Sequence, residues 1–261
     1  METLRRNIRG AVIIGALIAF LGVVLVYLIP NADVLKQYGE LMQSMPAFLI
    51  NMVGGADAQF MASPEGLLAL GFYGRVNLIF AIYALVAGLN ITANEEDRGI
   101  MDVLLTTPLP RWYVIVEKFV AYALIMILIA LISWLGLWLT TRTSNVFVID
   151  GGRLFEATIN LVPGSLVVIA VSALIATIVR RRGTATALAA AFVAFSYFGD
   201  VLGMTASDVA FLRKVSFFSY YDSTALLQTG TQWSSVIGLL VVAVIAVIGS
   251  VWAWQRRDVG V

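Results

Sequence analysis

Six apolar stretches constrain the fold of this chain more than any other feature. Each is about 20 residues long, the length that an α-helix needs to cross a hydrocarbon core of roughly 30 Å. A soluble protein could not bury so much apolar surface, since 60% of the 261 residues are apolar and 13% are charged, against roughly 25% charged in soluble domains. The stretches predict membrane spans near residues 11–29, 70–92, 113–139, 159–179, 184–203 and 234–254.

The spans occupy half of the chain and leave too little between them for a separate soluble domain. We therefore expect an all-α integral membrane protein with one transmembrane domain over residues 1–261. The first span follows Arg5, Arg6 and Arg9, as a signal peptide would. Its apolar stretch is long, however, and no small-x-small cleavage site follows Pro30. We expect this span to be retained as an anchor.

The basic residues predict the orientation, because Lys and Arg are retained on the cytoplasmic side. With the N-terminus inside, most of the 17 basic residues lie on inner segments. Those residues are Arg5, Arg6, Arg9, Arg98, Arg111, Lys118, Arg180, Arg181, Arg182, Arg256 and Arg257. Both termini are therefore predicted to be cytoplasmic in a multi-pass protein of the plasma (inner) membrane. The arginines at 180–182 mark topology in this reading; binding of anionic lipid or a partner is the alternative.

Composition also limits the chemistry. The chain has no Cys and no His, which excludes disulfides, thiolate nucleophiles, His-based triads and imidazole metal sites. A net charge of +1 gives no field that would recruit nucleic acid. An intramembrane enzyme would depend on an unassisted Ser or Tyr. We expect no catalytic, cofactor-binding or metal-binding residues, and a function that is conformational.

The segment between the second and third spans carries the clearest functional pattern. Asn94 is a suitable helix N-cap, and the acids at 95–97 oppose the positive end of the helix dipole. Pro108 ends the segment. An amphipathic helix is predicted over residues 94–107, on the cytoplasmic surface. It is net acidic, whereas helices that bind anionic lipid are basic, so a basic or polar protein surface suits it better; a solvated connector is the alternative.

The run from Glu95 to Lys118, EEDRGIMDVLLTTPLPRWYVIVEK, resembles the coupling region of ABC type-2 transporter permeases. In that family an acidic pair precedes Arg-Gly, an acid, a Leu pair, Pro-x-x-Arg and a Lys. Asp102 stands where Glu is usual, and Glu117 where Gly commonly precedes the Lys. The residues that we expect to couple to an ATPase are Asn94, Glu95, Glu96, Asp97, Arg98, Gly99, Asp102, Arg111 and Lys118.

The resemblance implies a permease subunit that forms an export path and works in two copies with two ATP-binding cassette subunits. The chain itself has no G-x-x-x-x-G-K-[ST] loop, so ATP and Mg are expected on the partner and no cofactor on this chain. Movement of the coupling helix would then switch the spans between inward-open and outward-open states.

The interior of the predicted bundle suggests the kind of substrate. Uncharged, aromatic-containing spans suit a lipid, a hydrophobic peptide or an amphipathic drug better than a sugar or a metal ion. For the second span, hydrogen bonding between helices is the alternative role of its Asn residue. The candidate path residues are Asn77, Tyr83, Phe192 and Phe195.

The fifth span carries small residues at four-residue spacing, which allows another helix to approach closely. We expect this face to contact a second permease copy or a paralogue, with membrane lipid around the dimer. The residues of the face are Ala187, Ala190, Ala191 and Ala194.

Three outer features are predicted as well. Residues 33–53 have a helical apolar period, with a bend at Pro46, and form a helix that lies on the outer leaflet or caps the bundle. The sequence at 63–65, Ser-Pro-Glu, is typical of a helix start. The aromatic residues between 205 and 231 form either an interfacial belt or a substrate gate.

Two other functions are compatible with six spans. A secondary transporter needs ionisable residues near the bilayer midplane to bind its driving ion, and the mid-span positions here carry almost no charge. A structural membrane scaffold needs no energy source at all. Recovery of an ATP-binding partner would distinguish the permease from both.

Overall fold

The computed structural model describes residues 2–29, 32–44, 58–92, 111–179, 181–205 and 207–256. This part of the chain is helical and contains no strand. Six of its helical stretches are long and apolar enough to cross a membrane, which confirms the predicted number of spans. They are α1 (Glu2–Leu28), α5 with η1 and α6 (Pro64–Leu67, Leu68–Tyr73, Gly74–Leu89), α9 (Arg111–Thr143), α10 with α11 (Gly151–Ile159, Leu161–Ile178), α12 (Arg182–Thr205) and α15 (Trp233–Gln255).

The helices extend beyond the apolar windows from which they were predicted. The first and fourth spans gain most: α1 begins at Glu2, and α10 precedes α11 and brings the start of the fourth span forward to Gly151. Asp150 caps α10 by accepting a hydrogen bond from the backbone N–H of Arg153 at 3.1 Å. Polar turns such as these carry no hydropathy signal, although they continue the helix.

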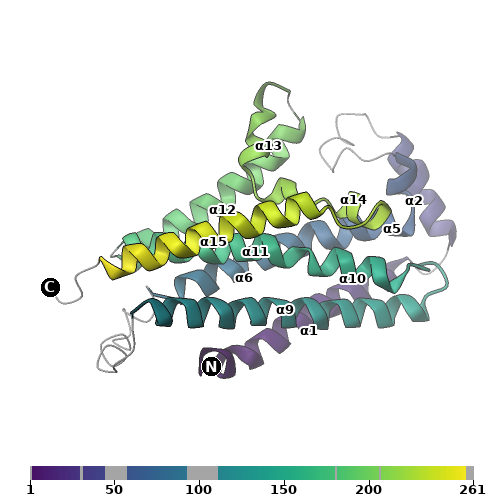
Figure 1. Ribbon diagram of the computed structural model, residues 1–261. Helices are drawn as coiled ribbons and strands as arrows, with labels where there is room; N and C mark the ends of the chain where they lie inside the picture. Colours follow the sequence, from purple (N-terminus) through teal and green to yellow (C-terminus); the bar gives the residue numbers. More distant parts are fainter. Residues whose placement is uncertain are drawn as a thin grey trace.

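The bundle has two distinct ends (Figure 1). We call one the terminal end: it holds the first turns of α1, α9 and α12 and the last turns of α6, α11 and α15. The other we call the distal end, and the shorter helices lie there. These are α2 (Ala32–Ser44), α4 (Ala58–Met61), η2 (Ser207–Val209), α13 (Phe211–Val215), η3 (Phe218–Tyr220) and α14 (Ser223–Gln228).

Two of the predicted outer features can be compared with the structure. α2 covers the first part of the amphipathic segment, and residues 45–53, including Pro46, lie outside the described residues. The helix start at Ser63 is confirmed, since its hydroxyl accepts a hydrogen bond from the backbone N–H of Gly66 at 3.1 Å.

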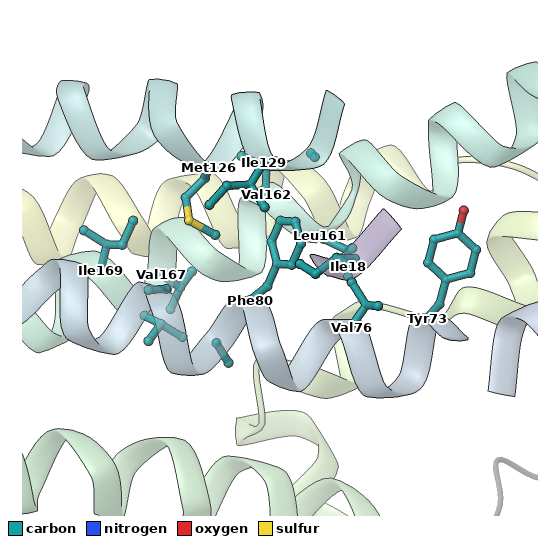
Figure 2. Close-up of a cluster of buried hydrophobic side chains, with 14 of the residues drawn as sticks. Ile18, Tyr73, Val76, Phe80, Met126, Ile129, Leu161, Val162, Val167 and Ile169 are labelled. Carbon is teal, nitrogen blue, oxygen red and sulfur yellow. The ribbon is translucent and has the colours of Figure 1, made fainter. Parts of the chain in front are cut away.

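α11 is the central helix. In its span 72% of the apolar window is buried, against 22% for α12 and for α15, and it packs against α6, α9, α12 and α15. Figure 2 shows the core, in which Phe80 of α6 lies with Ile129 of α9 and Val162 of α11. α1 packs chiefly on α9, at the edge of the bundle. The interior is therefore built around one buried helix.

Glycines allow the closest helix contacts. At Gly136 of α9, an added Cβ would lie 2.4 Å from the Cβ of Ala19 in α1. At Gly88 of α6, it would lie 2.5 Å from the carbonyl oxygen of Ile169 in α11. Helices in a bilayer gain no hydrophobic energy by leaving lipid for one another, so close packing of this kind is a principal source of their association.

Replacing Gly136 by alanine should weaken the α1–α9 contact. The new methyl group cannot be accommodated without moving α1, and overpacking of this kind costs about 1–3 kcal/mol. Gly238→Ala in α15 is the matched control, because nothing lies within 4 Å of a Cβ at that position. Thermal unfolding in detergent should show a lower midpoint for Gly136→Ala and no loss for Gly238→Ala. Equal midpoints would contradict the packing assigned to Gly136.

Candidate functional site

Most of the predicted coupling residues lie outside the described residues. These are Asn94, Glu95, Glu96, Asp97, Arg98, Gly99 and Asp102. Arg111 is the first residue of α9, and Lys118 lies two turns further along the same helix. The structure therefore describes the two helices that flank the coupling segment, and one of the predicted side chains.

Lys118 ties these two helices together. Its side chain is only 3% exposed, and its ammonium group donates a hydrogen bond of 2.9 Å to the carbonyl oxygen of Ile91, just beyond the end of α6. A cation at this position also interacts favourably with the negative end of the helix dipole. The bond joins residues on either side of segment 93–110, so it fixes the end of α6 relative to the start of α9.

The end of α6 is also packed tightly against α11. Gly88 allows the backbone of α6 to approach Ile169 and Ser172 so closely that no side chain would fit between them. Ile91 and Thr92, which follow the helix, are fully buried. The end of α6 is therefore fixed to both α9 and α11.

The four alanines predicted for dimer packing are all exposed on α12. The buried residues of this helix form a different stripe, which includes Ala185, Ala189 and Val193. That stripe faces the rest of the chain, where α12 packs on α11, α6 and α13. The described part of the chain thus leaves the alanine face of α12 uncovered.

The four candidate path residues do not line one cavity. Asn77 lines a chamber at the distal end, and Tyr83 lines a groove between α1 and α6. Phe192 stacks on Phe217, with ring centroids 5.8 Å apart. Phe195 is 59% exposed on α12. Only the first two lie at hollows of the structure, and these two hollows adjoin each other on α6.

The chamber of about 580 Å³ lies between α6 with its preceding turn and the α12–α14 region. We call it the distal chamber. An ion pair forms part of its wall, in which Nε of Arg213 lies 3.3 Å from Oδ1 of Asp200. Arg75, Asp222 and Tyr221 also line it. The sequence places Arg75 and Asp200 at the outer ends of two spans, but only the fold brings them to one cavity.

A π-helical turn, η1 (Leu68–Tyr73), forms another part of this wall. It is fastened from two sides. The Tyr73 hydroxyl lies 3.1 Å from the carbonyl oxygen of Leu154, to which it donates a hydrogen bond, and 3.0 Å from the hydroxyl of Thr158, both in α10. The Ser223 hydroxyl donates to the carbonyl oxygen of Ala69 at 3.1 Å. π-turns are rare inside α-helices, and those that occur are often found at functional sites.

The aromatic residues of the distal end pack mainly inside the chain. Phe217 and Phe218 are buried against α12, whereas Phe211 and Tyr220 are exposed. Tyr221 donates from its hydroxyl to the carbonyl oxygen of Ala157 at 2.9 Å, and burial raises the pKa of Tyr221 well above its ordinary value. Phe217, Phe218 and Tyr221 therefore pack the distal end from inside, and Phe211 and Tyr220 face outward.

A bundle of six long apolar helices with a central buried span is the architecture of a multi-pass membrane protein. A family model described as "ABC-2 family transporter protein" matches residues 3–259. The chain belongs to this family, as its coupling motif predicted, and is the membrane subunit of an ABC transporter. Membership implies an ATP-binding partner subunit. No curated protein matches the chain.

Loss of the Lys118 ammonium should loosen the base of the coupling segment. Lys118→Met keeps much of the side-chain volume and leaves the Ile91 carbonyl without this donor, which costs about 1–3 kcal/mol for a buried group. Lys214→Met, an exposed cation of α13, is the control. Thermal unfolding should show a lower midpoint for Lys118→Met alone. An unchanged midpoint would show that the bond to Ile91 does not hold the two helices.

Proposed function

We propose that this chain forms the translocation path of an ABC exporter and couples it to ATP hydrolysis on a separate ATP-binding cassette subunit. The family match over residues 3–259 carries the proposal. The Lys118–Ile91 bond supports it, since it makes the two helices that flank the coupling segment move together. ATP and Mg would be held by the partner, and the coupling helix over 94–107 would dock on it.

The terminal end is proposed to face the cytoplasm. Among the described residues it carries the basic clusters at 5–9 and 181–182, as retention of positive charge inside requires. Aromatic rings with an Arg above them occur at both ends: Arg256 lies 4.1 Å from the ring centroid of Trp252, and Arg142 lies 5.1 Å from that of Trp138. Such pairs suit the two membrane–water interfaces of the plasma (inner) membrane.

Two copies of the chain are proposed to pair through α12. Its alanine face is uncovered, and small residues allow a partner helix to approach closely. A paralogous permease with a similar face would fit in the same way. Two permease copies would then bind two ATP-binding subunits.

The substrate is proposed to be a lipid, a hydrophobic peptide or an amphipathic drug. The support is the distal chamber, with polar and charged walls, next to an apolar groove on the same helix. A sugar would find little to hydrogen-bond in that groove.

Charge reversal of the coupling acids should uncouple the transporter. Glu95→Lys, Glu96→Lys and Asp102→Lys, combined in one variant, should lower transport at least tenfold in vesicles that contain the ATP-binding subunit. The three introduced lysines would repel the basic surface on which the acids are proposed to dock. Glu40→Lys, at an exposed acid of α2, is the control for charge reversal at the other end.

A pull-down of the wild-type chain in mild detergent should recover an ATP-binding subunit in stoichiometric amount. Its absence would favour a secondary transporter or a scaffold. Unchanged transport by the reversed variant would instead remove the docking role from these three acids.

Single cysteines at Ala187 or Ala191 should crosslink two copies of the chain. The native sequence has no Cys, so any disulfide dimer comes from the introduced residue, and disulfide formation requires Cβ atoms about 3.5–4.5 Å apart. Ile245→Cys, on the exposed face of α15, should remain monomeric on a non-reducing gel. Equal crosslinking at Ile245 would argue against an α12 interface.

A further inference from the structure

The distal chamber contains one cation without an acidic partner among the described residues. Arg213 pairs with Asp200 at 3.3 Å. The carboxylate of Asp222 accepts two backbone N–H groups, from Thr224 and Ala225, each at 3.0 Å, and so caps α14. Arg213 and Asp200 are therefore paired with each other, and Asp222 caps α14 through Oδ1, whereas no carboxylate of the described residues pairs with Arg75.

Arg75 is the only charged residue between positions 70 and 92. Its Nη1 donates to the carbonyl oxygens of Leu70, at 3.4 Å, and Gly71. A guanidinium has five N–H donors in a fixed fork, so these two bonds leave further donors on the side that lines the chamber. A charged group within a membrane span is costly and is by default a sign of function.

Hydrogen bonds to neighbouring helices hold the part of the chamber wall that carries Arg75. Arg75 lies two residues after the π-turn, and the π-turn supplies both carbonyl groups that Arg75 contacts. Tyr73 and Ser223 hold this turn to α10 and α14. The guanidinium is therefore preorganised, which reduces the cost of binding an anion.

The second hollow continues from the first. It is a groove of about 850 Å³ between α1 and α6, lined almost entirely by apolar side chains, with Leu17 on one side and Ile82 on the other. Leu21 and Ile79 line both hollows. The groove extends to Val86, about 16 Å from Arg75 along the helix at 1.5 Å per residue.

We propose that the distal chamber and the α1–α6 groove form one site for an amphipathic molecule with an anionic phosphate or carboxylate head group and an acyl chain. The head group binds Arg75, and the chain lies along Leu17 and Ile82. A cationic head group would be repelled by Arg75 at this position. As the assignment of a substrate class, this inference rests on the proposed function.

Binding of two chain-matched lysolipids to the purified full-length chain tests the proposal. In neutral detergent, oleoyl lysophosphatidic acid should bind at least tenfold more tightly than zwitterionic oleoyl lysophosphatidylcholine, measured by native mass spectrometry. Inorganic phosphate, which has no chain, should compete only at concentrations at least a hundredfold higher. Equal affinity for the two lysolipids, or competition by phosphate at the lipid's own concentration, would overturn the two-part site.

Variants separate the head-group site from the groove. Arg75→Gln should weaken binding of the anionic lysolipid much more than that of the zwitterionic one, whose phosphate has choline as an internal counter-charge, and so remove the preference; retained binding of the zwitterionic lysolipid also reports an intact fold. Arg75→Lys should keep part of the preference, since an ammonium retains the charge but not the fork. Arg142→Gln, at a distal cation outside the chamber, should have no effect. An unaltered preference in Arg75→Gln would overturn the role of Arg75.

Ile82→Trp should fill the groove and weaken both lysolipids about equally, whereas Ile237→Trp, on the exposed face of α15, should not. Unchanged binding to the Ile82 variant would overturn the chain site. None of these measurements requires the ATP-binding subunit. A failed pull-down would therefore refute the proposed function alone, and loss of the anionic preference would refute this inference alone.

Discussion

The structure depends on the burial of α11 among its neighbours. A bilayer supplies no hydrophobic force between helices, so the bundle is held where backbones approach closely and side chains interlock. Gly88 brings α6 against α11 in this way, and Gly136 brings α9 against α1. The peripheral helices α12 and α15 are attached to this centre on one side only, which leaves broad apolar faces for lipid or for another subunit.

The two ends of the bundle differ in their packing and in their polar groups. At the terminal end, a single buried ammonium group closes the base from which the coupling segment leaves. At the distal end, short helices and buried aromatic rings surround a polar chamber. The first end is therefore closed by a buried hydrogen bond, and the second surrounds a cavity with charged side chains in its wall.

The sequence predicts the number of membrane-spanning helices because an apolar run of about 20 residues forms few structures other than a membrane span. It also predicts the helix start at Ser63, where capping is local. It does not predict the extension of the fourth span to Gly151, since α10 is too polar to register as a span. The distal chamber escapes prediction for a different reason: Arg75, Asp200 and Asp222 are far apart in sequence, and only helix packing brings them together. The coupling role of the acids at 95–97 and 102 stays a prediction from the motif, because these residues lie outside the described part of the chain.

The π-turn at Leu68–Tyr73 sets the rotation of α6 relative to α5. A π-turn contains one more residue than an α-turn. Each residue of an α-helix turns the chain by about 100° around the helix axis, since there are 3.6 residues per turn. Conversion of this turn to α geometry would therefore rotate everything beyond it relative to α5. Arg75 and Asn77 would turn together with α6, and the hydrogen bonds of Tyr73 with Leu154 and of Ser223 with Ala69 would have to break.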